Sequence, residues 1–469
     1  MVTASGGVFF IPEMRSTMRE YLLLGARVIN PAEGLSELRD LGVRDGLLCP
    51  AEEISPDAVC LHLRGKVVAP GFLDLHVHLR DPGQTYKEDL QTAAAAAACA
   101  GFTAVLAMPN TSPAMDCPAA IRAITARAEQ LGVMAVYQSA ALTVGRKGEQ
   151  LTDFAALKAA GVRALTDDGS TPQDEALMRA AMLAARELSL PVIDHCEDAS
   201  LSRGGVMHAG AVSAELAVPG QPRAAEERIV ERDIRLARET GCRVHLQHLS
   251  SAGSVDRLRQ AQREGLPVTG EVTPHHLCFT DAAVRQYGSQ AKMAPPLREE
   301  SDRKALLQGL ADGTLSVLAT DHAPHSAEEK ARGLLTAPFG IIGLEAAVPV
   351  GLTLLYHSGL LSLEQFIALF TVGPRQVLGL PPPSLAHGAP AELTILDPGV
   401  EHTLEVASFH SKSRNCPWQG VSCRGRALGS LSHSQLWGEV WDCHLPGRHG
   451  KIDAGQACGG PGQTGKKHT

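Results

Sequence analysis

The stretch Gly71-Phe-Leu-Asp-Leu-His-Val-His-Leu-Arg80 combines an apolar run of strand length with two histidines at alternate positions. Side chains alternate across a β-strand, so His76 and His78 point to the same face, about 7 Å apart along the backbone. Two imidazoles at that spacing can reach one metal ion. The stretch therefore predicts a buried strand with a metal-binding end.

Seven further apolar runs of strand length follow, each separated from the next by enough chain for a helix. With the first run, the expected strands cover residues 72–78, 103–108, 133–139, 162–166, 191–195, 243–248, 267–272 and 315–320. Eight parallel strands that alternate with helices favour a closed (β/α)8 barrel, a TIM-like α/β fold. The first helix is expected to follow a capping box of Thr85 and Glu88 and to end at Gly101.

Potential metal ligands recur where later predicted strands end. In a barrel the carboxyl ends of the strands meet at one face, so these side chains are expected to converge with His76 and His78. Four imidazoles and two carboxylates at one buried face would be costly without a metal ion. The additional candidates are Asp168, His195, His248 and Asp321.

Other histidines are interpreted without a functional role. We expect His245, His275 and His276 to be structural residues held by hydrogen bonds, and His208 to be a loop residue. An isolated histidine at a strand end is more often hydrogen-bonded than metal-bound.

The chain outside the barrel is divided between its two ends. Short alternating runs over residues 20–69 predict antiparallel strands, and a further strand is expected over residues 392–397. We therefore expect a small β-sandwich domain built from residues 17–70 and 385–445 around a barrel of residues 71–384. Residues 1–16 are expected to be an extension. Residues 446–469 have a disordered composition, and the strand signal weakens beyond Trp418.

The composition excludes some classes of protein. The 469 residues carry a net charge of -8, unlike the basic surface of a nucleic-acid-binding protein. No apolar run is long enough to cross a bilayer, and the first residues lack the pattern of a signal peptide. The 11 cysteines are scattered, without a Cys-x-x-Cys pair. We expect a cytoplasmic protein with reduced thiols and neither a nucleic-acid nor a membrane partner.

Several strings stand in the order typical of one enzyme family, from about Leu22 to Gly420. The strings are Pro70-Gly-Phe-Leu-Asp-Leu-His-Val-His-Leu-Arg-Asp-Pro-Gly83, Ala107-Met-Pro-Asn-Thr111, Thr166-Asp-Asp-Gly169, His195-Cys-Glu-Asp198, Glu271-Val-Thr-Pro-His-His-Leu277, Pro295-Pro-Leu-Arg298, Ala319-Thr-Asp-His-Ala-Pro-His325 and Ala337-Pro-Phe-Gly340. On these strings the chain resembles the dihydroorotases of the amidohydrolase superfamily, of the bacterial class I type whose two-zinc site has an aspartate bridge.

The resemblance implies a set of metal ligands. His76, His78 and Asp321 would hold one zinc ion, His195 and His248 would hold the other, and Asp168 would bridge both. Asp167 is the competing candidate for the bridge. Histidine and carboxylate ligands also accept cobalt or manganese, so the residues leave the metal's identity open.

The resemblance also implies a reaction, the reversible cyclisation of N-carbamoyl-L-aspartate to L-dihydroorotate plus water in de novo pyrimidine (UMP) biosynthesis. A bridging hydroxide would be the nucleophile in the hydrolytic direction, and Asp321 would be the general acid and base. Arg80, Asn110 and His325 would bind the substrate carboxylate, and the turn at Phe339 and Gly340 would contact the ring.

One departure from the family concerns substrate binding. The family string Asn-Pro-Pro-Leu-Arg begins with Ala294 in this chain, and alanine cannot make the side-chain hydrogen bond of that asparagine.

Two alternative functions remain beside the dihydroorotase. A hydantoinase or allantoinase would open another cyclic amide, but such relatives are expected to use a lysine bridge. A non-catalytic scaffold of aspartate carbamoyltransferase would typically lack several of the histidines. A homodimer or a complex with aspartate carbamoyltransferase is the expected assembly.

Overall fold

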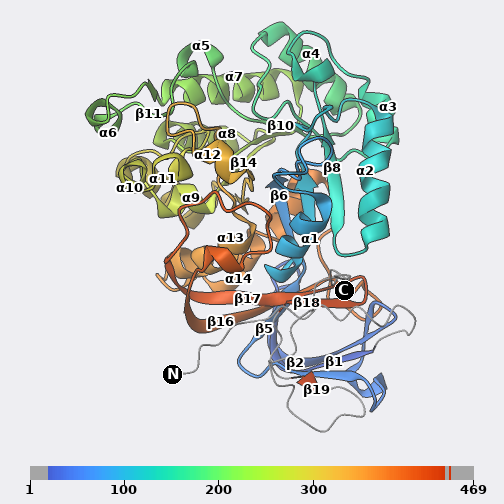
Figure 1. Cartoon of the computed structure of the whole chain (residues 1–469). Coiled ribbons are helices and arrows are strands. Elements are labelled where there is room, and N and C mark those ends of the chain that lie inside the picture. Colours follow the sequence, from blue (N-terminus) through green and yellow to red (C-terminus); the bar gives the residue numbers. More distant parts are fainter. Residues whose placement is uncertain (1–19, 439–442, 445–469) are drawn as a thin grey trace, which may run out of the picture.

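The computed structural model describes residues 20–438 and 443–444, and the predictions for residues 1–16 and 446–469 lie outside them. Two large sheets organise the chain (Figure 1). One has eight parallel strands surrounded by helices, and the other has nine strands drawn from both ends of the chain. The predicted fold class, a TIM-like barrel with a separate β domain, is confirmed.

The eight barrel strands each overlap an expected range and pair in chain order. They are fully or largely buried, as parallel strands covered by helices must be, which explains their continuous apolar runs. The strands are β6 (Phe72–Val77), β7 (Phe102–Ala107), β8 (Ala135–Ala140), β9 (Ala164–Leu165), β10 (Val192–Asp194), β13 (Val244–Leu246), β14 (Val268–Val272) and β15 (Val317–Leu318).

The barrel closes by few backbone contacts between its last and first strands. The sheet order runs from β15 to β6 without a ladder that joins these two strands. Isolated parallel bridges join Val77 to His322 and His322 to Ile341, and the His78 amide donates to the His322 carbonyl at 3.0 Å. We call this junction between β6 and β15 the seam.

Helices cover the outside of the barrel (Figure 1). The longer ones are α1 (Leu90–Cys99), α2 (Pro118–Leu131), α4 (Glu175–Glu187), α7 (Ala224–Thr240), α8 (Ala252–Arg263), α11 (Glu300–Ala311), α13 (Leu344–Gly351) and α15 (Val372–Leu378). Shorter ones are α3 (Phe154–Ala159), α5 (Ala199–Ser202), α6 (Ala211–Glu215), α9 (Pro274–Cys278), α10 (Ala283–Tyr287), α12 (Ala327–Lys330) and α14 (Leu363–Ala368). Among the described residues, no helix has the length and hydropathy needed to span a bilayer.

The start of α1 differs from the prediction. Its capping box consists of Asp89 and Thr92, and the Asp89 carboxylate accepts from the Thr92 amide at 2.9 Å. The predicted box of Thr85 and Glu88 is wrong because Glu88 is fully buried and accepts hydrogen bonds from a distant segment near residue 411. The predicted end is correct, since the helix stops before Gly101, whose φ is 93°.

The second sheet joins the two ends of the chain. Its central strand β5 pairs with β1 on one side and with β16 on the other, and Val68 lies opposite Ile395. Strand β17 was not predicted, because Gly425 and Gly429 interrupt its apolar alternation. The strands are β1 (Tyr21–Asn30), β2 (Leu35–Arg44), β3 (Leu47–Cys49), β4 (Val59–His62), β5 (Val67–Pro70), β16 (Leu393–Thr403), β17 (Ser422–Ser432), β18 (Gln435–Gly438) and β19 (Cys443–His444).

The two sheets are tied together where the chain enters the barrel. The hydroxyl of Thr394 on β16 donates to the Gly101 carbonyl at 2.6 Å and accepts from the Phe72 amide at 3.0 Å. Helix α1 packs on β17 and β18, which its small alanine side chains allow. The second sheet therefore holds the beginning of β6, the strand that carries His76.

Candidate active site

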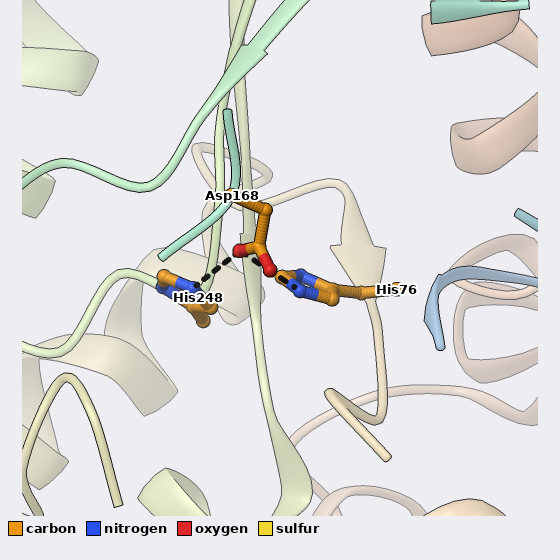
Figure 2. Close-up of side chains that lie close together, drawn as sticks. All are labelled: His76, Asp168 and His248. Carbon is orange, nitrogen blue, oxygen red and sulfur yellow. Dashed lines mark ion pairs between the residues drawn. The ribbon is translucent and has the colours of Figure 1, made fainter. Parts of the chain in front are cut away.

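Asp168 lies at the centre of the predicted ligands, at the carboxyl ends of the barrel strands. Figure 2 shows its carboxylate between the rings of His76 and His248. Asp168 Oδ1 is 3.4 Å from His76 Nε2, 3.8 Å from His195 Nδ1 and 4.0 Å from His248 Nε2. Asp168 Oδ2 is 3.7 Å from His78 Nε2. The carboxylate therefore faces all four histidines.

The remaining ligand candidates lie on either side of Asp168. Asp321 Oδ1 is 3.0 Å from His78 Nε2 and 3.5 Å from His76 Nε2. On the other side, His195 Nδ1 is 2.9 Å from His248 Nε2. All six residues are buried, since none is more than 6% exposed.

These residues fit divalent metal ions. Two overlapping groups have ligand atoms within 4.8 Å of one another, His76 with Asp168 and His248, and His76 with His78 and Asp321. The Nε2 atom of His76 is buried without a hydrogen-bond partner, and a metal ion would satisfy it. Imidazole nitrogen and carboxylate oxygen together suit zinc and similar metals.

The charges at the centre depend on one another. Burial would lower the pKa of His76, but the Asp321 and Asp168 carboxylates outweigh it and raise this pKa well above its ordinary value. The Glu197 carboxylate likewise outweighs burial and raises the pKa of His195.

Burial alone would raise the pKa of Asp168, but the neighbouring imidazoles, His76 above all, outweigh it and hold this pKa well below its ordinary value. The pKa of Asp321 is lowered for the same reason. Burial, with the repulsion of His195 second, lowers the pKa of His248 to about 3. Ionised carboxylates and a neutral imidazole are the forms that bind metal.

The predicted carboxylate-binding residues border this centre. Arg80 is 8% exposed, donates from Nε to the Pro324 carbonyl at 3.1 Å, and has Nη2 3.3 Å from His325 Nε2. Burial, then the charges of Arg80 and nearby lysines, lower the pKa of His325 to about 3. Gly340 packs against the His325 ring, because a Cβ atom there would lie 2.7 Å from Cδ2.

Two other substrate candidates take different positions. The Asn110 amide group donates to Asp168 Oδ2 at 3.1 Å and its oxygen lies 2.8 Å from His78 Nδ1, so Asn110 contacts the ligands directly. The Phe339 ring lies under the Lys292 ammonium, with 4.6 Å between nitrogen and ring centre.

The comparisons with known proteins establish the family of the chain. A family model described as "Dihydro-orotase-like" matches residues 65–254. A dihydroorotase of Anaeromyxobacter sp. (strain K) is 48% identical over 412 residues, which cover 87% of this chain and 95% of the relative. A dihydroorotase of Pelotomaculum thermopropionicum is 45% identical over 406 residues, 86% of this chain and 95% of the relative. The chain belongs to the dihydroorotase family.

Solved structures agree with the fold of this dihydroorotase-family chain. The L-hydantoinase of Arthrobacter aurescens superimposes with a TM-score of 0.80 at 23% identity, over 92% of this chain and 98% of that one. A D-hydantoinase gives a TM-score of 0.79 at 20% identity, over 91% and 97% of the two chains. At these identities the likeness is one of fold alone.

Glu271 contacts two of the candidate metal ligands, His76 and His248, in this dihydroorotase-family chain. Its carboxylate lies 2.8 Å from His76 Nδ1 and 3.1 Å from His245 Nε2, and it accepts from the His248 amide at 3.2 Å. These hydrogen bonds, that of His245 foremost, outweigh burial and lower the pKa of Glu271 to about 2. An anion at Nδ1 directs Nε2 of His76 toward the centre. The local sequence predicts no role for Glu271, although this residue lies near the end of a predicted strand, as the candidate ligands do.

The histidines outside the centre follow the prediction only in part. His245 and His276 are hydrogen-bonded structural residues, as predicted. His275 is fully buried, but neither of its ring nitrogens has a hydrogen-bond partner. The prediction that His208 lies in a loop is wrong, because His208 belongs to strand β11 (Met207–His208), which pairs with β12 (Gly220–Gln221). Its Nδ1 atom is 3.3 Å from Arg298 Nη1.

The backbone at the centre is strained. Asp321, His248 and Arg80 have φ angles of 44°, 32° and 57°. These angles lie in the left-handed region, which residues other than glycine rarely adopt. Such strain persists only where surrounding contacts fix the backbone. The dihydroorotase-family site is therefore held in place by its neighbours.

Glu271→Gln is expected to weaken the binding of a divalent ion about 10- to 100-fold, because His76 loses the anion that orients it. Absorption titration with Co²⁺ against a competing chelator measures the change. Glu226→Gln is the matched control, because Glu226 is a buried carboxylate that accepts from the Ser250 and Ser251 amides instead. Equal affinity in Glu271→Gln and wild type would contradict the role of Glu271.

Asp168→Asn is expected to reduce the bound metal to at most one ion per chain, because an amide is a poor bridge between two cations. Its neighbour Asp167 gives the control: the Asp167 carboxylate accepts from the Thr143 amide at 3.1 Å, whereas it is the Asp168 carboxylate that lies within 4.0 Å of all four histidines. Metal analysis after gel filtration compares the two variants. Loss of metal in Asp167→Asn, with no loss in Asp168→Asn, would show that Asp167 and not Asp168 is the bridging residue.

Proposed function

We propose that this enzyme is a zinc-dependent dihydroorotase, which reversibly cyclises N-carbamoyl-L-aspartate to L-dihydroorotate with loss of water in de novo pyrimidine biosynthesis. The observation that supports this most strongly is the Asp168 carboxylate, which faces four imidazoles within 4.0 Å. Relatives named dihydroorotase that are 45–48% identical over most of the chain support the choice of substrate.

The ligands would divide into two groups around Asp168. His76, His78 and Asp321 would hold one zinc ion, and His195 and His248 would hold the other, with Asp168 shared. When bound, the ions supply a water molecule of lowered pKa and polarise the ring carbonyl.

Asp321 is the proposed proton carrier. Its carboxylate is ionised at neutral pH and lies among the candidate ligands, 3.0 Å from His78 Nε2, where it can accept the proton of the attacking water. In hydrolysis Asp321 then passes this proton to the departing ring nitrogen. In cyclisation the same carboxylate removes the proton from the carbamoyl nitrogen.

Arg80 and His325 would bind the substrate carboxylate beside the metal centre. The bond from Arg80 Nε to the Pro324 carbonyl fixes the plane of the guanidinium, and its remaining N–H groups suit a carboxylate. Asn110 has one amide N–H beyond the bond to Asp168 and can offer it to the same carboxylate. Phe339 and Gly340 would contact the ring of the substrate. At Ala294, the family's contact would have to come from a backbone group.

Two other functions would give different results in the same assay. A hydantoinase or allantoinase would hydrolyse another cyclic amide. A scaffold of aspartate carbamoyltransferase would hydrolyse none, but the convergence of all six candidate ligands favours an active centre. The cytoplasmic location, the homodimer and the complex with aspartate carbamoyltransferase remain predictions.

Zinc-loaded protein is expected to hydrolyse L-dihydroorotate and to leave hydantoin and allantoin intact. Asp321→Asn is expected to lower kcat by about 100-fold or more, the usual contribution of a general acid and base. The hydrolysis is measured by the loss of absorbance of the ring amide. A chelator of divalent ions is expected to abolish the hydrolysis. Turnover of hydantoin or allantoin alone would move the assignment to that activity, and inactivity on all three with metal bound would favour the scaffold.

A further inference from the structure

Residues 409–418, which we call the seam segment, connect β16 with β17 and cross the seam of the barrel. On the β6 side, the Ser413 hydroxyl donates to the Lys87 carbonyl at 2.7 Å, and the Lys412 amide donates to Glu88 Oε1 at 3.0 Å. Ser411 also donates to the Glu88 carboxylate. The seam segment is thereby fixed to the loop that follows β6.

On the β15 side, Asn415 makes three hydrogen bonds with one side chain. Its Nδ2 donates to the Ala323 carbonyl at 2.9 Å and to the Gly340 carbonyl at 3.0 Å, and its Oδ1 accepts from the His325 amide at 2.9 Å. Asn415 is only 3% exposed, so water cannot replace these bonds. A planar amide with two donor hydrogens and one acceptor is required here, and aspartate lacks the donors.

The seam segment is anchored beyond Asn415 as well. The Ile342 amide donates to the Asn415 carbonyl at 3.0 Å, and the indole nitrogen of fully buried Trp418 donates to the Ile342 carbonyl at 2.8 Å. Asn415 therefore belongs to a part of the chain that is fixed by hydrogen bonds of its side chain and of its backbone.

Asn415 adds a side-chain link between two loops that also meet directly, since the Ala323 amide donates to the Ile341 carbonyl at 3.0 Å and the Gly343 amide donates to His322 Nδ1 at 3.2 Å. One loop carries His325 and the other carries Gly340, whose backbone packs directly against the His325 ring. A shift of either loop would change the space between His325 and Gly340, where there is no side chain at position 340 to fill a gap.

We infer that Asn415 is a positioning residue for the substrate, because it fixes His325 and Gly340 relative to each other and thereby sets the affinity for the cyclic amide. This inference rests on the proposed function, in which His325 and Gly340 contact the substrate. Asn415 itself touches none of the six candidate metal ligands through any of its three side-chain hydrogen bonds.

The test compares Asn415→Asp with Asn30→Asp. Asn30 is also fully buried, and its amide donates to the Pro383 carbonyl and accepts from the Ala32 amide, but it lies on β1 in the second sheet. Asn415→Asp is expected to raise KM about tenfold or more, the equivalent of one or two lost hydrogen bonds, with kcat and bound zinc close to wild type. Asn30→Asp should leave KM unchanged. Asn415→Ser replaces Asn415→Asp if the latter does not accumulate as folded protein.

A second measurement follows the protein without turnover. Hydrogen exchange of residues 322–326 and 337–343 should accelerate in Asn415→Asp and not in Asn30→Asp. An unchanged KM in Asn415→Asp, a KM change equal to that of Asn30→Asp, or a parallel loss of zinc would each overturn the inference.

Different results would contradict the proposed function and the positioning role of Asn415. If wild type hydrolyses hydantoin instead of L-dihydroorotate, the proposed function fails, and the KM ratio on hydantoin still tests Asn415. If wild type hydrolyses no cyclic amide, unchanged exchange in Asn415→Asp overturns the positioning role, and accelerated exchange confined to the two loops supports it.

Discussion

The carboxylate of Asp168, buried among four imidazoles, is the constraint on which the rest of the site depends. Burial disfavours its charge, and the surrounding imidazoles, His76 above all, outweigh burial and keep it ionised. The same imidazoles would repel one another if all were protonated, and His248 is kept neutral for this reason as well as by burial. Cations between these rings and carboxylates resolve both conflicts, since they bind the neutral rings and balance the charges.

The barrel supplies the positions, and the neighbouring layers supply the orientations. Parallel strands bring residues that are distant in sequence to one face, as in other barrels of this type. Glu271 then orients His76 and holds the backbone of His248, whereas Asn110 contacts His78 and Asp168. The left-handed backbone at Asp321 is stabilised by this packing and has no local cause in the sequence. The orientations of the candidate ligands therefore depend on contacts across the whole face at which the barrel strands end.

The sequence predicted the parts of this architecture that depend on local patterns. Buried parallel strands read as apolar runs, and the ligands stand at the ends of those runs, so the barrel and the convergence of the six ligands at one face could be anticipated. Contacts between distant segments could not. Glu88 has the spacing of a capping residue, but its carboxylate is used by the seam segment. Strand β17 and the role of Asn415 likewise depend on partners that are far away in sequence, and no local pattern marks them.

The central claim is that Asp168 bridges two metal ions, and anomalous diffraction from crystals of the zinc-loaded protein tests it most directly. Data collected on both sides of the zinc absorption edge should give two peaks per chain, one on each side of the Asp168 carboxylate and both within bonding distance of it, about 2.0–2.2 Å. Absence of peaks among these residues, or a single peak that does not contact Asp168, would contradict the account.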